Sequence, residues 1–146
     1  MGRKIQNTNG ESGMNWIGVR YPLSYEQIKA VERELDVNLP EDYCIKIGKI
    51  NGGALSDAYI MHQTLGEISY SRNVSLSKKS RENIFTLYGI VSDEHNSLFP
   101  FGSVGDGDYF CFDLKNQNVV LWMHEMDAIE YICDSFTDLL QMIREL

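Results

Sequence analysis

The sequence predicts an α+β domain, in which an antiparallel twisted sheet packs against two N-terminal helices and one C-terminal helix that cover one of its faces. Three observations lead to this fold class. Two helical patterns fill residues 24–50, short aromatic and β-branched runs fill residues 98–133, and a third helical pattern follows. The connections between the runs are short, so neighbouring strands must be antiparallel.

A chain of 146 residues suits one domain with its own core. We expect residues 1–22 to form an N-terminal arm and lead-in, and residues 23–146 to form the single domain. Residues 1–16 are polar and rich in Gly, Asn and Ser, which is typical of a mobile segment. Residues 16–23 are expected to lie extended against the domain.

The first helix is predicted to begin after Ser24, because Ser24 and Gln27 form a capping-box pattern. Ile28, Val31 and Leu35 follow at i, i+3 and i+7, which places them on one helical face. This face is expected to be buried against the sheet.

The second helix is predicted to begin within residues 39–43 (LPEDY). Proline is well placed in a first helical turn, and two acidic residues suit the positive end of the helix dipole. Tyr43, Ile47 and Ile50 form its apolar stripe. Residues 51–53 (NGG) are expected to end the helix, since Asn and Gly can adopt a left-handed cap.

The middle of the chain gives weaker signals. Short strands are predicted at residues 58–61 and 67–70. Residues 71–83 are polar and are interpreted as an exposed loop; its basic residues lack interleaved aromatics, so a basic binding patch is not predicted. Residues 83–88 alternate like a strand, and residues 92–97 are expected to form a loop.

The densest apolar runs predict the centre of the sheet. They lie at residues 98–102, 109–112 and 119–123, separated by turn-forming residues 105–107 and 115–118.

The end of the chain predicts one more strand and a helix. The strand is expected at residues 129–133. A terminal helix is predicted over residues 134–143, with Ser135 and Asp138 capping its start.

The net charge of −8 is unevenly distributed. Residues 1–92 contain 11 Lys or Arg against 10 Asp or Glu, whereas residues 93–146 contain 2 against 11. An acidic surface repels nucleic acid and membrane surfaces and speeds encounter with basic partners. We therefore expect no nucleic-acid or membrane partner. The longest apolar runs are too short to cross a bilayer and no signal peptide is evident, so a cytoplasmic location is expected.

No constellation of residues predicts an enzyme, a cofactor site or a metal site. The three histidines lack metal-ligand spacing, and the glycine-rich turn at residues 102–107 lacks the pattern of a phosphate loop. The three cysteines are expected to be buried and reduced. A spatial pair of Cys133 with His124 stays open at this point.

Three groups of residues, in this order and spacing, resemble the SUKH superfamily, which includes bacterial immunity proteins and fungal regulators of cell-wall synthesis. The resemblance covers residues 23–146. The groups are residues 39–43 with 51–53, residues 99–102 with 107–113, and residues 119–124 leading into 134–136.

The resemblance implies a non-catalytic α+β domain. For a bacterial member it implies a cytoplasmic antidote to a polymorphic or contact-dependent toxin, often a nuclease. Pro100, Phe101, Gly102 and Trp122 then belong to a recurrent fold core, and the shared motif does not locate the toxin-binding surface.

The leading hypothesis is an immunity protein that occludes the basic active-site cleft of a cognate toxin with an acidic surface. The alternative is a protein-interaction or regulatory domain of the same fold with a cellular partner. The oligomeric state stays open. The candidate partner-binding residues lie in loops that flank the strands and are Asp93, Glu94, Asp106, Asp108, Glu125 and Asp127.

Overall fold

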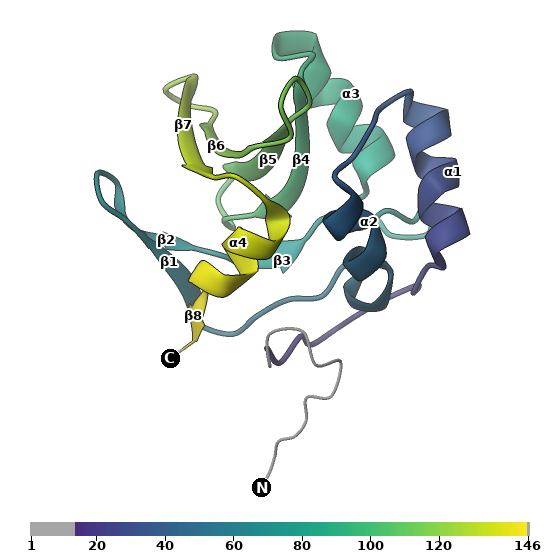
Figure 1. Cartoon of the computed structure of the whole chain (residues 1–146), viewed down its shortest axis with the longest axis horizontal. Helices are drawn as coiled ribbons and strands as arrows, with labels where there is room; N and C mark the ends of the chain where they lie inside the picture. Colours follow the sequence, from purple (N-terminus) through teal and green to yellow (C-terminus); the bar gives the residue numbers. More distant parts are fainter. Residues whose placement is uncertain (1–13, 146) are drawn as a thin grey trace, which may run out of the picture.

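The structure of the chain is a computed structural model that describes residues 14–145. Within these residues the chain forms four α-helices and two antiparallel sheets, neither of them closed (Figure 1). The predicted α+β class is confirmed, with one helix and one sheet more than expected. The predicted mobile arm lies outside the described residues, apart from residues 14–16.

The first helix, α1 (Tyr25–Leu35), begins as the sequence predicts. The side chain of Ser24 accepts a hydrogen bond from the Gln27 backbone at 3.1 Å, and the Gln27 side chain accepts one from the Ser24 backbone at 2.8 Å. This reciprocal pair satisfies two donors that the helix start would otherwise leave unpaired. The helix ends at Asp36, which adopts a left-handed conformation with φ 55°.

The second predicted helix is confirmed in two parts, α2 (Glu41–Lys46) and the 3-10 helix η2 (Ile47–Ile50). Its apolar stripe is buried, with Tyr43 at the centre of an aromatic cluster. Before the first helix, the lead-in lies against the domain, because Ile17 exchanges backbone hydrogen bonds with Ala54.

Two sheets organise the rest of the chain. The smaller sheet has the order β2-β1-β8 and the larger has the order β3-β4-β5-β6-β7, all antiparallel. The small sheet contains β1 (Ala58–His62), β2 (Gly66–Ser69) and β8 (Arg144–Glu145). The large sheet contains β3 (Arg72–Asn73), β4 (Leu98–Ser103), β5 (Tyr109–Asp113), β6 (Val119–Met123) and β7 (Ala128–Cys133).

Both faces of the large sheet are buried over β4, β5 and β6, which corrects the expectation that helices cover only one face, while the outer face of β7 is open. On the main face, Phe101 stacks on Phe112 with ring centroids 4.1 Å apart, and Phe136 of α4 (Phe136–Met142) packs edge-on against both. On the other face, Val91 packs with a smaller cluster. That cluster contains Leu98, Cys111, Val120 and Trp122.

The strand predicted at residues 83–88 is wrong: these residues begin α3 (Ile84–Glu94). The Asn83 side chain accepts hydrogen bonds from the backbone of Phe85 at 2.9 Å and of Thr86 at 3.2 Å, which fixes a helix start. β-branched and aromatic residues favour strands, but packing against the sheet outweighs that propensity here. The same helix shortens the loop predicted at residues 92–97.

The exposed loop predicted at residues 71–83 is also partly wrong. Residues 73–77 are buried, and β3 adds Arg72 and Asn73 to the edge of the large sheet. The buried side chain of Asn51 accepts a hydrogen bond from the Leu76 backbone at 2.8 Å. Polar residues lie inside here because their hydrogen bonds are satisfied, which hydropathy alone does not reveal.

The last helix follows the prediction. Ser135 caps α4 by accepting a hydrogen bond from the Asp138 backbone at 3.0 Å. Among residues 14–145, no helix combines the length and the apolar character that crossing a membrane requires.

Candidate functional site

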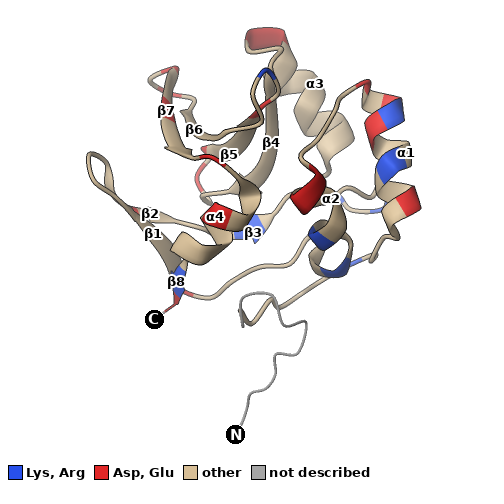
Figure 2. Cartoon of the chain, in the orientation of Figure 1, with Lys and Arg blue, Asp and Glu red and all other residues tan. Residues whose placement is uncertain are grey.

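The six predicted partner-binding residues, which we call the acidic surface, lie in one helix end and two turns around the large sheet, and we call these three segments the acidic connections. The prediction that all six lie in loops is wrong for Asp93 and Glu94, which are helical. Asp93 and Glu94 end α3, residues 106 and 108 lie between β4 and β5, and residues 125 and 127 lie between β6 and β7. Five of the six are exposed and Asp108 is half-buried. Figure 2 shows acidic residues on the β6–β7 turn and at the end of α3.

Asp127 links the β6–β7 turn to the end of α3. Its Oδ1 lies 2.7 Å from His95 Nε2 and accepts a hydrogen bond from Trp122 Nε1 at 3.3 Å. The hydrogen bond with His95, followed by that with Trp122, lowers the pKa of the Asp127 carboxyl below its usual value. These two hydrogen bonds therefore stabilise the ionised form of the Asp127 carboxyl.

Asp108 links the β4–β5 turn to the β6–β7 turn. Its Oδ1 lies 3.1 Å from His124 Nδ1 and accepts a hydrogen bond from the His124 backbone at 3.2 Å. The His124 and His95 rings both pack edge-on against buried Trp122, with centroids 6.3 Å and 5.7 Å away. The three acidic connections therefore meet around one tryptophan. This meeting is not visible in the sequence.

Glu94, His95 and Asp127 form a group in which three potential metal-ligand atoms lie within 4.8 Å of one another. Among the described residues it is the one such group. Hydrogen bonds already explain the position of Asp127, since it pairs with His95 and Trp122. The position of the Asp127 side chain therefore does not require a bound metal ion.

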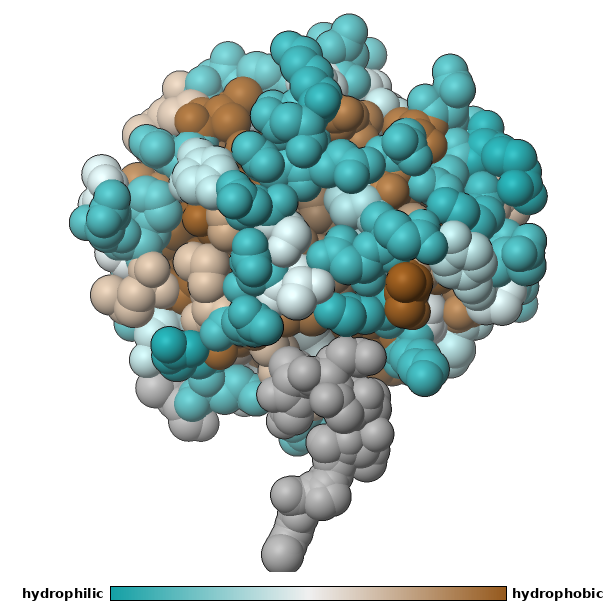
Figure 3. Space-filling model, viewed as in Figure 1, coloured by the Kyte–Doolittle hydropathy of each residue, from teal (hydrophilic) through white to brown (hydrophobic). Residues whose placement is uncertain are grey.

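An apolar surface lies beside the acidic turn, on the β6–β7 hairpin. Met126 is 69% exposed, Ile129 45% and Tyr131 52%. Figure 3 shows brown, apolar surface over this hairpin. β7 is an edge strand of its sheet, with His62 Nε2 3.1 Å from the Tyr131 carbonyl oxygen. Strand alternation alone could have placed Ile129 and Tyr131 on one face, but not shown that this face is open.

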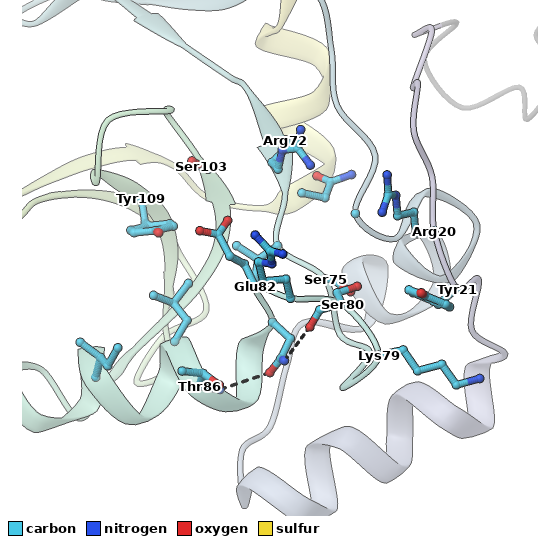
Figure 4. Close-up of a pocket in the computed structure, with 17 residues that line it drawn as sticks. Arg20, Tyr21, Arg72, Ser75, Lys79, Ser80, Glu82, Thr86, Ser103 and Tyr109 are labelled. Atoms are coloured by element: carbon cyan, nitrogen blue, oxygen red, sulfur yellow. Dashed lines mark hydrogen bonds between the residues drawn. The ribbon is translucent and has the colours of Figure 1, made fainter.

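A second surface, opposite in charge, was not predicted. A cavity of about 530 Å³ is lined by four basic side chains and one carboxylate, and we call it the basic pocket. The basic residues are Arg20, Arg72, Lys79 and Arg81, and the acidic one is Glu82. Figure 4 shows Arg20 on the lead-in, Arg72 on β3, and Lys79 and Glu82 on the loop before α3, the loop to which Arg81 also belongs.

Sequence reasoning missed this pocket for a clear reason. Lys78, Lys79 and Arg81 were predicted not to form a binding patch, because three charges without interleaved aromatics are weak evidence, and Arg20 lies far from them in the chain. The only local signal was the NGG motif, whose Asn51 holds these segments together. Its Nδ2 donates to the carbonyl oxygen of Arg20 at 2.9 Å, and its Oδ1 binds the segment after β3.

The cysteines are buried and free, as predicted. Burial raises the pKa of the Cys44 thiol to about 12, and the same cause raises that of Cys133 to about 12. Cys133 donates to the backbone oxygen of Ser135 at 3.4 Å, while His124 is engaged with Asp108. Thiols this weakly acidic are poor nucleophiles at neutral pH.

Comparison with known proteins identifies the fold family. The profile of the SUKH_6 family, described as SMI1-KNR4 cell-wall, matches residues 25–140, which is well over half of the chain. No curated protein matches the sequence. The matched region begins at α1 and ends within α4, so it includes both sheets except β8. The chain therefore belongs to the SUKH family, a family of immunity-like and generally non-catalytic proteins.

Proposed function

We propose that this protein is a cytoplasmic immunity protein, which binds a cognate bacterial toxin and blocks it without catalysis. The observation that carries the proposal is the junction of three acidic connections beside an exposed apolar hairpin. Charge alone could be a solubilising feature. Charge next to Met126, Ile129 and Tyr131 is typical of a protein-binding surface, because exposed aromatic and Met side chains are enriched in interface cores.

The charge favours a toxin with a basic cleft, such as a nuclease. A nuclease needs basic residues to hold the phosphates of its substrate, and an acidic protein can occupy the same cleft. The protein has a net charge of −8, and residues 93–146 contain 11 acidic against 2 basic residues. Electrostatic steering of this kind raises association rates more than it raises affinity.

The apolar hairpin would supply the affinity. In protein interfaces a few buried aromatic and aliphatic side chains contribute most of the binding free energy, and charged residues surround them. Ile129 and Tyr131 are two positions apart in β7, so their side chains lie on the same face and can contact a toxin together. The carboxylates of Glu125 and Asp127 would then lie at the rim, next to this core.

The direct test is co-expression with the product of the adjacent toxin gene, scoring rescue of growth and a stable complex. The wild-type protein should restore growth. A variant with Ile129→Ser and Tyr131→Ala should bind the toxin at least a hundredfold more weakly, since hot-spot side chains contribute about 2 kcal/mol each. Ile45→Ser is the matched control, because Ile45 is similarly exposed but lies on α2.

The outcome separates the two candidate functions. Failure of the wild-type protein to bind or neutralise the neighbouring toxin would reject immunity and leave the regulatory alternative. Rescue with an unchanged affinity in the hairpin variant would instead keep immunity and reject this binding surface.

A further inference from the structure

We propose that the basic pocket binds a phosphate-bearing small molecule. This inference does not rest on the immunity function, because the pocket is built from residues outside the acidic surface. In an acidic protein, a cavity with four basic side chains and one carboxylate concentrates positive charge where the rest of the surface is negative.

The cations of the pocket are available for a ligand. Within residues 14–145, none of the three arginines Arg20, Arg72 and Arg81 forms an ion pair, although the acidic residue Glu82 lines the same cavity. The ammonium group of Lys79 lies 5.7 Å from the centroid of the Tyr21 ring and also has no carboxylate partner among these residues. Three guanidinium groups favour phosphate, since their planar donors bind two oxygens at once.

The pocket is rigidly supported. Asn51 is fully buried and donates to the carbonyl oxygens of Arg20 and Tyr21 at 2.9 and 3.3 Å, and to Ser75 Oγ at 3.2 Å. Asn73, also buried, donates to the Ile50 carbonyl oxygen at 3.0 Å. The lead-in and the segment after β3 are therefore fixed relative to each other, which limits the entropy lost when a ligand binds.

The opposite wall of the pocket offers neutral donors and apolar surface. Figure 4 shows Thr86 on α3, with Ser103 and Tyr109 on the sheet side. In the described part of the chain the hydroxyl groups of these three residues make no hydrogen bond. Burial raises the pKa of the Tyr109 hydroxyl, so it stays a donor. Leu87 and Ile90 add apolar lining.

Size and surroundings favour a small ligand over a nucleic acid. The cavity volume of about 530 Å³ lies within the range of small-molecule sites. The β4–β5 turn, which carries Asp106 and Asp108, directly joins the pocket residues Ser103 and Tyr109. A long polyanion crossing the pocket would meet these carboxylates, whereas a compact phosphorylated molecule with an aromatic or apolar part would not.

The test is isothermal titration of the full chain with ADP, pyrophosphate, adenosine and citrate. ADP should bind, pyrophosphate should bind at least fivefold more weakly, and adenosine should not bind at millimolar concentration. The double variant Arg20→Gln with Arg72→Gln should weaken ADP binding at least tenfold. Lys49→Gln with Lys115→Gln is the matched control, because it also removes two positive charges, from exposed residues outside the pocket.

Each other result rejects a defined part of the inference. Binding of citrate but of neither phosphate compound would overturn the choice of phosphate. Equal affinity for ADP and pyrophosphate would exclude a role of the apolar wall. No binding by any compound, or equal ADP binding by the pocket variant and wild type, would overturn the site itself. Thermal unfolding of each variant shows whether a loss of binding reflects a loss of folding.

Discussion

The acidic surface and the basic pocket differ in how their charges are held. Two acidic side chains, Asp108 and Asp127, already pair with histidines, and both lie on turns held mainly by exposed hydrogen bonds. The four pocket cations have no ion-pair partner within the described residues, but their segments are fastened by the buried Asn51. The protein therefore has a positively charged cavity on a rigid support, although its net charge is −8.

The difference suggests two uses of charge. Carboxylates on exposed turns suit steering and contact with a protein, whereas cations on a fixed support around a cavity suit a small ligand of defined shape. Single substitutions can test whether hydrogen bonds hold the segments of the basic pocket more firmly than the turns of the acidic surface.

The largest effect is expected from Asn51→Ala. Its side chain makes hydrogen bonds with Arg20, Tyr21, Ser75 and Leu76, so its removal leaves several buried groups without partners. We expect a loss of about 3 kcal/mol in the free energy of unfolding, measured by urea denaturation.

Asn116→Ala is the matched control on a surface turn. Asn116 is exposed and its Oδ1 accepts one hydrogen bond, from the Asn118 backbone at 2.9 Å. Its loss should cost less than about 1 kcal/mol. Equal losses of unfolding free energy in the two variants would show that the pocket segments are held no more firmly than the surface turn.

A smaller effect is expected from Gly107→Ala in the β4–β5 turn. Gly107 has φ 98°, and an added Cβ would lie 2.7 Å from His124 Cε1. We expect a loss of about 2 kcal/mol together with displacement of the His124 ring, followed by the NMR signals of that ring.

Gly105→Ala separates backbone strain from the contact with His124. Gly105 also has a positive φ, 120°, but an added Cβ would meet Ser71 only at an ordinary 3.7 Å. It should therefore lose stability without moving the His124 signals. Identical NMR changes in both variants would show that the turn does not hold His124 by direct packing.

The smallest effect concerns the Asp127 carboxyl. Its pKa is lowered in the folded protein, so its contribution to stability is present above the unfolded pKa of about 3.9 and is lost as the pH falls through the lower folded pKa. Wild type should be more stable than Asp127→Asn at pH 5, and the difference should shrink steadily as the pH drops below about 4. Urea titrations at a series of pH values measure this.

Asp93→Asn provides the comparison, since Asp93 makes no side-chain hydrogen bond within residues 14–145. Asp93→Asn breaks no hydrogen bond of that side chain, so it should lose less stability at pH 5 than Asp127→Asn. A pH-independent difference for Asp127→Asn would indicate that the His95 pair does not stabilise the fold.

The sheet could be predicted because its signals are local. Apolar runs bounded by Gly, Asp and Asn specify β4, β5 and β6, and capping residues such as Ser24 and Ser135 specify helix starts. Residues 83–88 failed because their composition favours a strand while Asn83 and the sheet face impose a helix.

The surfaces were harder to predict than the elements. Four of the six carboxylates were correctly predicted to lie in turns, whereas Asp93 and Glu94 end α3. The junction of these segments around Trp122 depends on hydrogen bonds between distant parts of the chain. The basic pocket depends on Asn51 bringing Arg20 next to residues that follow β3. Such contacts are set by tertiary structure and leave no periodic pattern in the chain.

Association kinetics with the purified toxin at low and high salt measure whether the acidic surface guides toxin binding. Asp106→Lys with Glu125→Lys is the most suitable variant, because neither side chain makes a hydrogen bond within the described residues. The matched control is Glu26→Lys with Glu145→Lys, which changes the net charge equally through exposed residues elsewhere.

We expect the acidic-surface variant to associate at least tenfold more slowly than wild type at low salt, and the difference to shrink as the salt concentration rises. The control should associate nearly as fast as wild type. Rate constants and a salt dependence equal to those of wild type in the acidic-surface variant would contradict the claim.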